Sequence, residues 1–434
     1  MDAPPLIPRL ILPRMLEALS DSPVVLLHGP RQCGKTTLAR HMGALQGYDY
    51  LSFDDDVQRR AAQADPVGFV AELPDRVILD EVQRVPELFT TIKAAVDARR
   101  LPGRFILTGS ANVLLVPKLA DSLAGRMELL RLHPLAQVEL SGGGPGFLSA
   151  LFQGQFRTGP AGARMGRLLA ARIAAGGFPA ALNRPSARRQ AAWYRDYTET
   201  LVQRDLRDLA RISALDAIPR LLTLAAGQTS HLMNISELAA PFSVSRPTIR
   251  DYMTLLSRIF LLEELAPWHN NRLSRLIKTP KLHLGDTGLA CALLGVDAEA
   301  LWLDRALFGQ MLETFVYQEL RRQASWSDAP VAFFHFRDKD QVEVDLVLES
   351  GPKLVGVEVK AASTVTGDDF RGLRKLRDSD PARFVSGVVL YDGAAIVPFG
   401  ERLHAVPITR LWEPAAGVAE DWRAHIEENL ITDL

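Results

Sequence analysis

Residues 24–37 read VVLLHGPRQCGKTT, and this stretch decides the fold of the first part of the chain. The run VVLLH is rich in β-forming residues, which predicts a strand, and the following TLARHM is compatible with a helix. Between them, GPRQCGKT fits the pattern GxxxxGK[ST], whose glycines let backbone N–H groups wrap around phosphates. Because the helix N-terminus adds a favourable dipole, the order strand, loop, helix predicts a nucleotide site.

The residues of this loop receive predicted roles. Lys35 is expected to reach the β- and γ-phosphates, and the Thr36 hydroxyl is expected to ligate Mg²⁺. The residues predicted to contact the nucleotide are Gly29, Pro30, Arg31, Gln32, Cys33, Gly34, Lys35, Thr36 and Thr37. ATP is the predicted nucleotide, but nothing in this pattern reads the base, so GTP stays an alternative.

A second motif supplies acids at the end of another strand. Val77–Asp80 is an apolar strand that ends in an acid, and Glu81 follows it directly. Asp80 is predicted to hold the Mg²⁺ shell, while Glu81 is placed to orient or deprotonate the attacking water. Both motifs rarely occur in this order by chance, so the sequence predicts an ATP-hydrolysing site.

Two further positions are candidates for the same site. The strand that begins at Phe105 ends in polar residues, and polar groups at the carboxyl ends of parallel strands face the ligand crevice. Thr108 or Ser110 is therefore a candidate sensor of the γ-phosphate, with a plain turn as the alternative. Arg126, in SLAGRM, is a candidate arginine finger for a neighbouring subunit of a homo-oligomer, with an ordinary surface arginine as the alternative.

The order of strand-like and helix-like segments predicts three domains in this chain of 434 residues. Apolar runs alternate with helix-like segments over 23–132, which predicts an α/β domain with a parallel sheet and helices on both faces. A glycine-rich break follows at 142–146. The predicted domains are a P-loop ATPase domain (1–145), a helical and winged-helix domain (164–290) and a C-terminal α/β domain (305–412).

The middle region carries an excess of arginine. Between Arg157 and Arg211 there are eleven arginines, no lysine and four acids, although the formal net charge of the whole chain is −1. This helical stretch is either a solvated surface or a contact for nucleic acid or another subunit. Further on, a short helix capped by Ser236, a second helix from Arg246 and the basic wing WHNNRLSRLIKTPKLH resemble a winged helix, which binds DNA, docks proteins or only supports structure.

The last region places charged residues at alternating positions of two strands. In QVEVDLVLE, Asp345 lies on the strand face opposite Val344 and its apolar neighbours, and in VEVK, Glu358 and Lys360 share one face. If the two strands are adjacent, these three charged side chains meet, with Glu313 from the preceding helix as a fourth member. Together, Glu313, Asp345 and Glu358 can hold Mg²⁺ or Mn²⁺ that activates water, while Lys360 stabilises developing charge. The alternative is an exposed hairpin face, where alternating charges are routine.

Composition narrows the class of protein. Hydrophobic residues make up 47% and charged residues 23%, as in an ordinary globular protein. Two cysteines, Cys33 and Cys291, cannot form a disulfide framework, which indicates a reducing cytoplasm. Prolines near the N-terminus disfavour an export signal, and no apolar run has the length of a membrane span. The expectation is a cytoplasmic protein without membrane contact.

Taken together, these motifs resemble a bacterial and archaeal family that joins an AAA-superfamily P-loop ATPase to a C-terminal domain of uncharacterised function. The segments that carry the resemblance are GPRQCGKTT (29–37), LDEVQRVPELF (79–89), GRFILTGSAN (103–112), SLAGR (122–126), GGFP (176–179), YTETLVQRDL (197–206), KTPKLHLGDTGL (278–289), EVDLVLE (343–349) and GVEVKAA (356–362). The resemblance implies a middle winged helix and a C-terminal restriction-endonuclease-like PD-(D/E)xK fold. Two departures concern that fold: no glutamine follows Lys360, and no proline–aspartate pair precedes Asp345.

Two functions remain open at this point. The first is an ATPase that couples ATP binding and hydrolysis to DNA binding or processing, with branched DNA as one substrate and the C-terminal domain as a metal-dependent nuclease. The second is a regulatory ATPase switch, in which an inactive nuclease-like domain binds protein or DNA passively. DNA-dependent turnover and metal-dependent cleavage distinguish the two.

Overall fold

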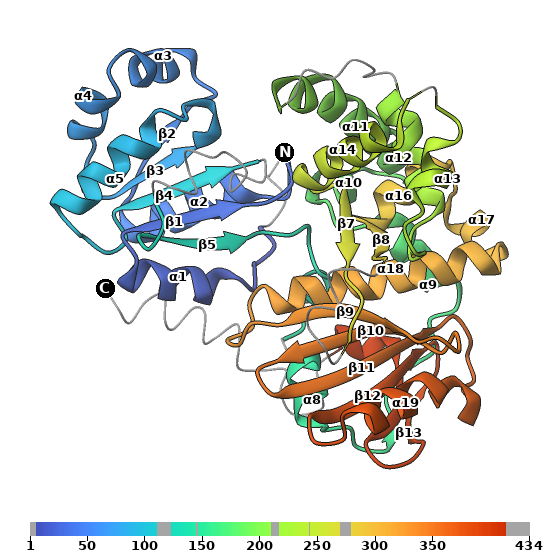
Figure 1. The fold of residues 1–434 in the computed structure, drawn as a ribbon. Coiled ribbons are helices and arrows are strands. Elements are labelled where there is room, and N and C mark those ends of the chain that lie inside the picture. The colour runs from blue at the N-terminus through green and yellow to red at the C-terminus, as the bar shows by residue number, and fades with distance from the viewer. Residues whose placement is uncertain are drawn as a thin grey trace. The chain divides into compact units, whose positions relative to one another are not determined.

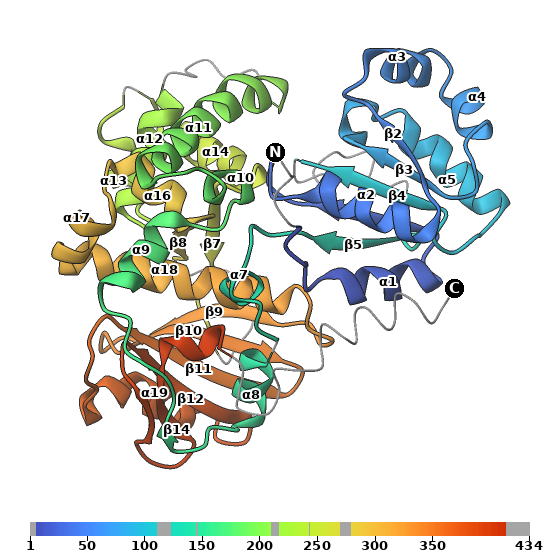
Figure 2. The same cartoon turned by 180° about the vertical axis from the view of Figure 1, so that it is seen from behind.

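The computed structural model describes residues 6–110, 123–144, 146–209, 217–242, 244–269 and 279–413, and only the backbone within 204–209. The described chain divides into two compact units. The first contains residues up to Leu135 together with Arg258–Phe260, and the second contains Ala136–Ser257 and the residues from Leu261 onward. Figures 1 and 2 show each unit from two sides. The finer division into three domains stays a prediction.

A five-stranded sheet forms the centre of the first unit. Its strand order is β2-β3-β4-β1-β5, and every neighbouring pair is parallel. The strands are β1 (Val24–His28), β2 (Asp49–Ser52), β3 (Val77–Asp80), β4 (Phe105–Gly109) and β5 (Met127–Arg131). The carboxyl ends of β1, β3 and β4 therefore lie along one edge of the sheet, where the phosphate-binding loop and the acids are found.

Helices cover both faces of this sheet, as the sequence predicts. Val24 of β1 packs into one core and Val25 packs into another, because successive strand residues point to opposite faces. The first core contains Ile92 of α5, and the second contains Met15 of α1 and Leu38 of α2. The helices of this unit are α1 (Leu12–Asp21), α2 (Lys35–Gln46), α3 (Asp56–Ala64), α4 (Pro66–Ala71) and α5 (Leu88–Ala98), with the short 3-10 turn η1 (Val82–Arg84) after β3.

The second unit begins with a helical region. Its helices are α7 (Gln137–Ser141), α8 (Phe147–Gln153), α9 (Arg167–Ala175), α10 (Pro179–Leu182), α11 (Ala187–Leu209), α12 (Ala217–Gly227), α13 (Ile235–Ala239) and α14 (Arg246–Arg258). The antiparallel hairpin of β7 (Leu262–Leu265) and β8 (Lys281–Leu284) follows, and Leu232 forms a bridge to Lys281. The prediction that Ser236 caps the short helix is wrong. Asn234 is the cap, because its side chain accepts the backbone N–H groups of Ser236 and Glu237. Most of the predicted wing, 270–278, lies outside the described residues.

A mixed seven-stranded sheet completes the second unit, with the order β6-β13-β14-β12-β11-β10-β9. The strands are β6 (Gly159–Pro160), β9 (Ala332–Arg337), β10 (Glu343–Ser350), β11 (Lys353–Lys360), β12 (Phe384–Tyr391), β13 (Ala395–Pro398) and β14 (Leu403–Pro407). The helices of this region are α16 (Thr287–Leu294), α17 (Ala298–Leu303), α18 (Arg305–Ala324) and α19 (Arg371–Ser379). The predicted strands at β9 to β12 and the preceding long helix are confirmed, whereas a restriction-endonuclease-like fold stays a prediction. None of the described helices combines the length and apolar character that a membrane crossing requires.

Candidate functional site

The phosphate-binding loop turns between β1 and α2 in the way its sequence predicts. Gly29 has φ +153°, and a Cβ atom there would lie 2.1 Å from the Leu132 carbonyl oxygen. Gly34 has φ +105° and is the N-cap of α2. Both positions therefore require glycine, one because of a close backbone approach and the other because of its left-handed conformation. The turn directs the first N–H groups of α2 into the loop.

Lys35 is held inside this loop by the backbone. Its side chain is buried, and its Nζ donates hydrogen bonds to the carbonyl oxygens of Gly29 at 3.0 Å and Pro30 at 2.8 Å. His28 precedes the loop, and burial lowers its pKa to about 4, with the charges of Arg131 and Lys35 acting in the same direction. The role of Lys35 as the charged side chain that contacts the β- and γ-phosphates stays a prediction.

Asp80 lies at the centre of a hydroxyl cluster at the carboxyl edge of the sheet. Thr36 donates to its two carboxylate oxygens at 3.1 and 3.0 Å, and the Tyr50 hydroxyl donates at 2.7 Å. The Thr108 hydroxyl, on β4, donates to the same carboxylate. The hydroxyl and carboxylate oxygens of Thr36 and Asp80 are hard ligands in direct contact, which fits Mg²⁺. Thr36 and Asp80 would hold the ion, which would supply positive charge to offset that of the nucleotide phosphates.

Glu81 belongs to a second, adjacent cluster. It has φ +58°, and its backbone N–H donates to the Thr108 hydroxyl at 3.1 Å. Ser110 Oγ donates to Glu81 Oε2 at 3.0 Å, and Gln83 Nε2 donates to both Glu81 and Ser110. The carboxylate is thus held in one orientation beside Asp80, as a residue that positions a water molecule requires. Ser110 contacts this acid, and Thr108 contacts Asp80.

Three residues of this site are absent from the sequence prediction. Tyr50 and Gln83 bind the two acids, and Arg9 donates to the carbonyl oxygens of Cys33 at 2.9 Å and His133 at 2.7 Å. Tyr50 lies inside β2, opposite Ile78 and two residues before Ser52, so the rule for the carboxyl ends of strands does not find it. No sequence pattern predicts the contact of Arg9 with the loop, since Arg9 lies 24 residues before Cys33.

Arg126 lies at the opposite end of the sheet from the nucleotide loop. It precedes β5 directly, whereas the loop follows β1, and the two strands are parallel with Val24 opposite Met127. Its guanidinium forms a two-pronged ion pair with Asp97 of α5, at 2.5 and 3.0 Å. Within this chain Arg126 therefore ties α5 to the start of β5. Its role as a finger for a neighbouring subunit stays a prediction.

The predicted residues of the second site do come together. On the antiparallel pair β10 and β11, Asp345 accepts a hydrogen bond from Val359 N at 2.9 Å, and Lys360 Nζ lies 2.9 Å from Glu358 Oε1. Glu313 of α18 joins them through Lys281, whose Nζ lies 2.8 Å from Glu313 and 3.4 Å from Asp345. Lys281 is thus a member that sequence reasoning placed in the wing and not in this cluster.

Burial changes the protonation of this cluster. It raises the pKa of Glu313 to about 8, with the Asp345 charge adding to this and Lys281 opposing it. Burial likewise raises the pKa of Glu358 to about 8, with Asp345 adding and Lys360 opposing. Burial acts to lower the pKa of Lys281, but the charges of Glu313 and Asp345 outweigh it and raise the value. Lys281 therefore stays charged beside the carboxyl groups of Glu313 and Asp345.

The three carboxylates do not form an evident metal centre. Over the described ranges, no group of three or more His, Cys, Asp or Glu side chains has an arrangement that could hold a metal ion. The assignment of Glu313, Asp345 and Glu358 as metal ligands therefore stays a prediction.

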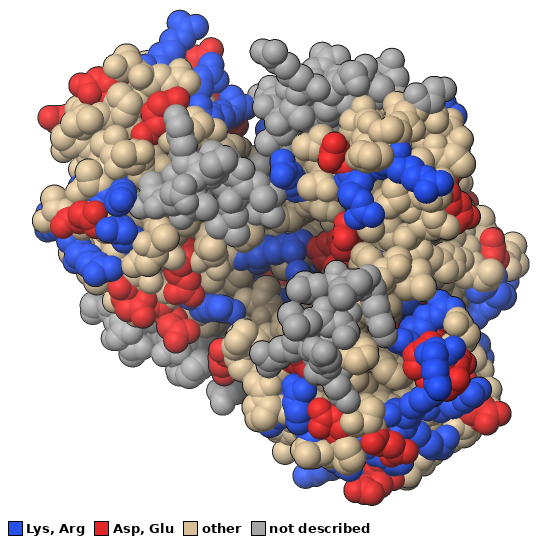
Figure 3. Space-filling view, in the orientation of Figure 1, with Lys and Arg blue, Asp and Glu red and all other residues tan. Residues whose placement is uncertain are grey.

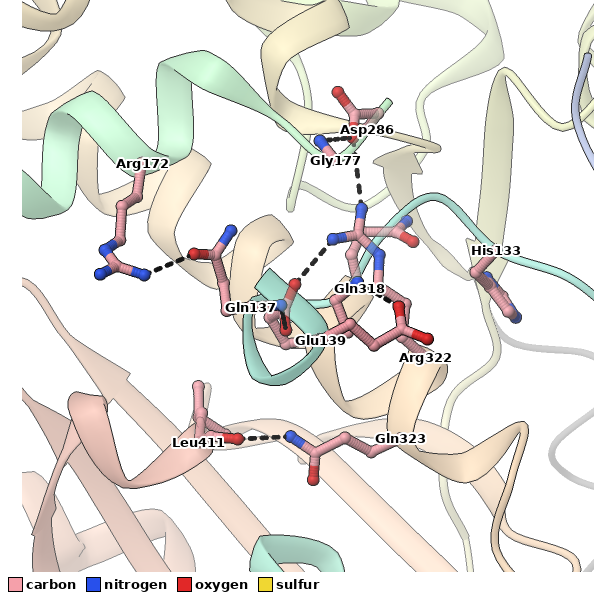
Figure 4. Close-up of polar contacts among 12 residues, drawn as sticks. His133, Gln137, Glu139, Arg172, Gly177, Asp286, Gln318, Arg322, Gln323 and Leu411 are labelled. Carbon is pink, nitrogen blue, oxygen red and sulfur yellow. Dashed lines mark hydrogen bonds and ion pairs between the residues drawn. The ribbon is translucent and has the colours of Figure 1, made fainter. Parts of the chain in front are cut away.

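A separate buried ionic network joins the helices of the second unit (Figure 4). Asp286, in the segment KTPKLHLGDTGL, accepts a hydrogen bond from Gly177 N at 2.8 Å and pairs with Arg322 at 3.2 Å. Arg322 also pairs with Glu319 at 2.7 Å, and Glu319 accepts the Gln137 backbone N–H at 2.8 Å. Because these groups are paired with one another, the network holds α7, α16 and α18 together and is structural.

Comparisons with known proteins agree with this reading of the first unit. The family described as "AAA domain" matches residues 21–141, and two families described as domains of unknown function, DUF8612 and DUF4143, match 166–300 and 308–411. The Walker-type ATPase of Pyrococcus abyssi is similar in structure at 18% identity and a TM-score of 0.39, covering 65% of this chain and 94% of that one.

Two sequence relatives determine the family. An uncharacterized protein of Mycobacterium bovis and one of Mycobacterium tuberculosis are each 32% identical to the chain over 401 residues, which covers 92% of this chain and 83% of theirs. The chain therefore belongs to the family of these two mycobacterial proteins and carries a P-loop ATPase domain of the AAA type.

Proposed function

We propose that this protein is a Mg²⁺-dependent ATPase that couples ATP binding and hydrolysis to the binding of DNA. The observation that carries the ATPase part is the arrangement around Asp80, where Thr36 and the neighbouring Glu81 stand beside a loop that contains Lys35. The DNA part is supported by exposed arginines in the second unit, because phosphate contacts supply most of the non-specific affinity for DNA.

The strongest basic feature lies at the start of α11. Arg184, Arg188 and Arg189 are all exposed, and none of them forms an ion pair with a described residue. Arg195, one to two turns further along, is also exposed. Because none of these four exposed arginines forms an ion pair with a described residue, this helix start is a candidate phosphate contact.

The region from α12 to β8 supplies a second candidate contact for DNA. The order α12, α13, α14, β7, β8, with Leu232 bridging the hairpin as a third short strand, supports a winged helix. Arg246 and Arg250 are exposed on α14, the helix that would enter a groove, although Asp251 lies beside them. Figure 3 shows Lys and Arg side chains over this part of the molecular face.

The test is the ATPase rate of the purified full chain without DNA and with single strands, duplex and a branched junction, at two salt concentrations. Stimulation by one DNA form that fades with added salt is the expected result, since phosphate contacts release counter-ions. Lys35→Ala should lose the activity with every DNA, and Lys339→Ala, an exposed lysine elsewhere, should retain it. A rate indifferent to all DNA forms at low salt contradicts the proposal.

A second candidate is the regulatory switch with a non-cleaving C-terminal domain. The ammonium of Lys281 between Glu313 and Asp345 favours this candidate over DNA cleavage, because a buried cation already balances the carboxylates. In that case a protein partner, or a second copy of the chain, receives the nucleotide-dependent signal. If the protein with ATP binds neither DNA nor a second copy of the chain, that result counts against both candidates.

A further inference from the structure

The carboxylate cluster of the second unit contains its own cation. Lys281 of β8 points into it, with Nζ 2.8 Å from Glu313 Oε1 and 3.4 Å from Asp345 Oδ1. The side chain of Lys281 is only 6% exposed, and those of Glu313 and Asp345 are 13% and 14% exposed. A buried ammonium between two carboxylates forms a strong, water-poor ion pair, which a surface lysine does not.

Two further carboxylate oxygens of the cluster accept hydrogen bonds, and one does not. Asp345 Oδ2 accepts the Val359 backbone N–H at 2.9 Å, and Glu358 Oε1 accepts from Lys360 at 2.9 Å. Glu358 Oε2 is buried without a hydrogen-bond partner among the described residues.

These residues do not fit a divalent ion. Mg²⁺ needs oxygen ligands at about 2.0–2.1 Å in near-octahedral geometry, with deprotonated carboxylates. Lys281 Nζ lies within hydrogen-bond distance of Glu313 and forms an ion pair with Asp345. It therefore occupies the position beside two of the three carboxylates that a metal ion would need as ligands. A second cation at that place would repel the ammonium in a medium that screens charge poorly. The cluster thus differs from the metal site that the nuclease resemblance implies.

The hairpin that carries Lys281 is attached to the C-terminal sheet at several other points. Trp268 N donates to the His335 carbonyl at 2.6 Å, His335 N donates to the Ala266 carbonyl at 2.9 Å, and Trp268 Nε1 donates to Glu349 at 2.8 Å. Tyr317 of α18 donates to Glu263 of β7 at 2.9 Å. Lys281 is therefore part of a continuous attachment between the β7–β8 hairpin and the sheet.

We propose that Lys281 is a built-in cation that replaces the divalent metal in the cluster of Glu313, Asp345 and Glu358. The cluster then serves to fasten the β7–β8 hairpin to α18 and β10, and the C-terminal sheet does not cleave phosphodiesters. This inference is independent of the ATPase and of DNA binding, because it concerns only the cation that these carboxylates hold.

Manganese binding to the nucleotide-free full chain tests the proposal. Mn²⁺ titrations followed by electron paramagnetic resonance are compared for the unmodified protein, Lys281→Ala and Lys360→Ala. Lys281→Ala should gain one Mn²⁺ site that binds about tenfold more tightly than any in the unmodified protein, because the competing charge is gone. Lys360→Ala is the matched control: it removes a lysine that pairs with Glu358 and is 34% exposed, and it should gain no site.

Two further measurements assign the site. Asp345→Ala introduced into Lys281→Ala should remove the gained site, and Mn²⁺ should raise the unfolding temperature of Lys281→Ala but not of the unmodified protein. The proposal is overturned if the unmodified protein binds Mn²⁺ with an affinity that Asp345→Ala abolishes, or if Lys281→Ala gains no site. If Lys281→Ala does not fold, the comparison of the unmodified protein with Asp345→Asn decides: equal Mn²⁺ binding supports the built-in cation, and a loss contradicts it.

Discussion

Asp80 gathers hydroxyl groups from three separate elements. Thr36, Tyr50 and Thr108 lie 44, 30 and 28 residues away in the sequence, and each donates a hydrogen bond to its carboxylate. A carboxylate that accepts several hydrogen bonds is held in one rotamer, and it is then preorganised for an incoming cation. The residues that bind Asp80 should therefore change the requirement for Mg²⁺ more than the affinity for the nucleotide.

Tyr50→Phe tests this directly. Removing one hydroxyl from Asp80 leaves the ring and its packing under Arg40 in place and costs roughly 0.5–1.5 kcal/mol, the typical net value of a hydrogen bond. We expect the Mg²⁺ concentration for half-maximal ATPase rate to rise roughly two- to tenfold. Steady-state ATPase assays over a Mg²⁺ series measure this.

Tyr48→Phe is the matched control for that measurement. Its hydroxyl donates to the Gly103 carbonyl, which lies before β4 and away from the acids. The Mg²⁺ requirement should be unchanged in Tyr48→Phe. An equal effect of both substitutions would mean that loss of stability, and not the contact with Asp80, is responsible.

At the scale of an element, the loop between β1 and α2 depends on the positive φ angles of Gly29 and Gly34. Its first glycine lies against the chain that follows β5, since Leu132 N donates to the His28 carbonyl at 2.8 Å. The loop is therefore shaped by β5 as well as by its own sequence. In the second unit, the β7–β8 hairpin is similarly positioned by α18, which is distant in the sequence.

Gly29→Ala should disrupt nucleotide binding through the backbone. The added Cβ would meet the Leu132 carbonyl oxygen at 2.1 Å, so the loop or β5 must shift, at a cost of about 1–3 kcal/mol. We expect ATP to lose its stabilising effect on thermal unfolding, and the ATPase rate to fall with it. Scans of unfolding with and without ATP and Mg²⁺ measure this.

Gly47→Ala distinguishes the backbone strain of a positive φ angle from a steric clash of the added Cβ atom. Gly47, the C-cap of α2, also has a positive φ of +69°, but nothing lies within 4 Å of an added Cβ. Its cost should be about 1–2 kcal/mol of left-handed strain with ATP binding retained. If Gly47→Ala abolishes ATP binding as Gly29→Ala does, the close approach to Leu132 is not the cause.

At the scale of the whole molecule, the chain combines an ATPase unit with a second unit that carries unpaired arginines. Its near-neutral total charge hides this local excess, because acids elsewhere balance it. An attraction to phosphates therefore depends on a patch and should be sensitive to salt and to the removal of a few side chains.

Replacement of Arg184, Arg188 and Arg189 by alanine measures this patch. If each contacts one phosphate, the slope of log affinity for duplex DNA against log salt should decrease by about 3, while the ATPase rate without DNA is unchanged. Fluorescence anisotropy with labelled duplex over a salt series gives the slope. The control replaces Arg371, Arg374 and Arg377 of α19, also three arginines at one helix, and should leave the slope unaltered. Equal effects from both triples would indicate a diffuse charge effect without a defined contact.

Much of the fold of the first unit could be predicted from the sequence, because the patterns that determine it lie within short stretches of consecutive residues. The GxxxxGK[ST] loop occupies eight consecutive residues, and apolar runs alternate with helices, so the parallel sheet and the positions of Lys35, Thr36, Asp80 and Glu81 are predictable. In parallel sheets the carboxyl ends of the strands meet at one edge, which also brought Ser110 into the prediction. The strand β10 and the end of β11 were predictable from the alternation of charged and apolar residues in QVEVDLVLE and VEVK.

Only the tertiary structure shows which residues far apart in the chain contact one another. Arg9 reaches His133 across 124 residues, and Lys281 reaches Glu313 and Asp345 across 32 and 64. No periodicity or motif encodes such a pair, because its energy comes from burial and from the opposite charge that folding places beside it. Sequence alone thus determined an ATPase loop and a pair of acid-bearing strands, and the packing of β8 against α18 determined which cation those strands hold.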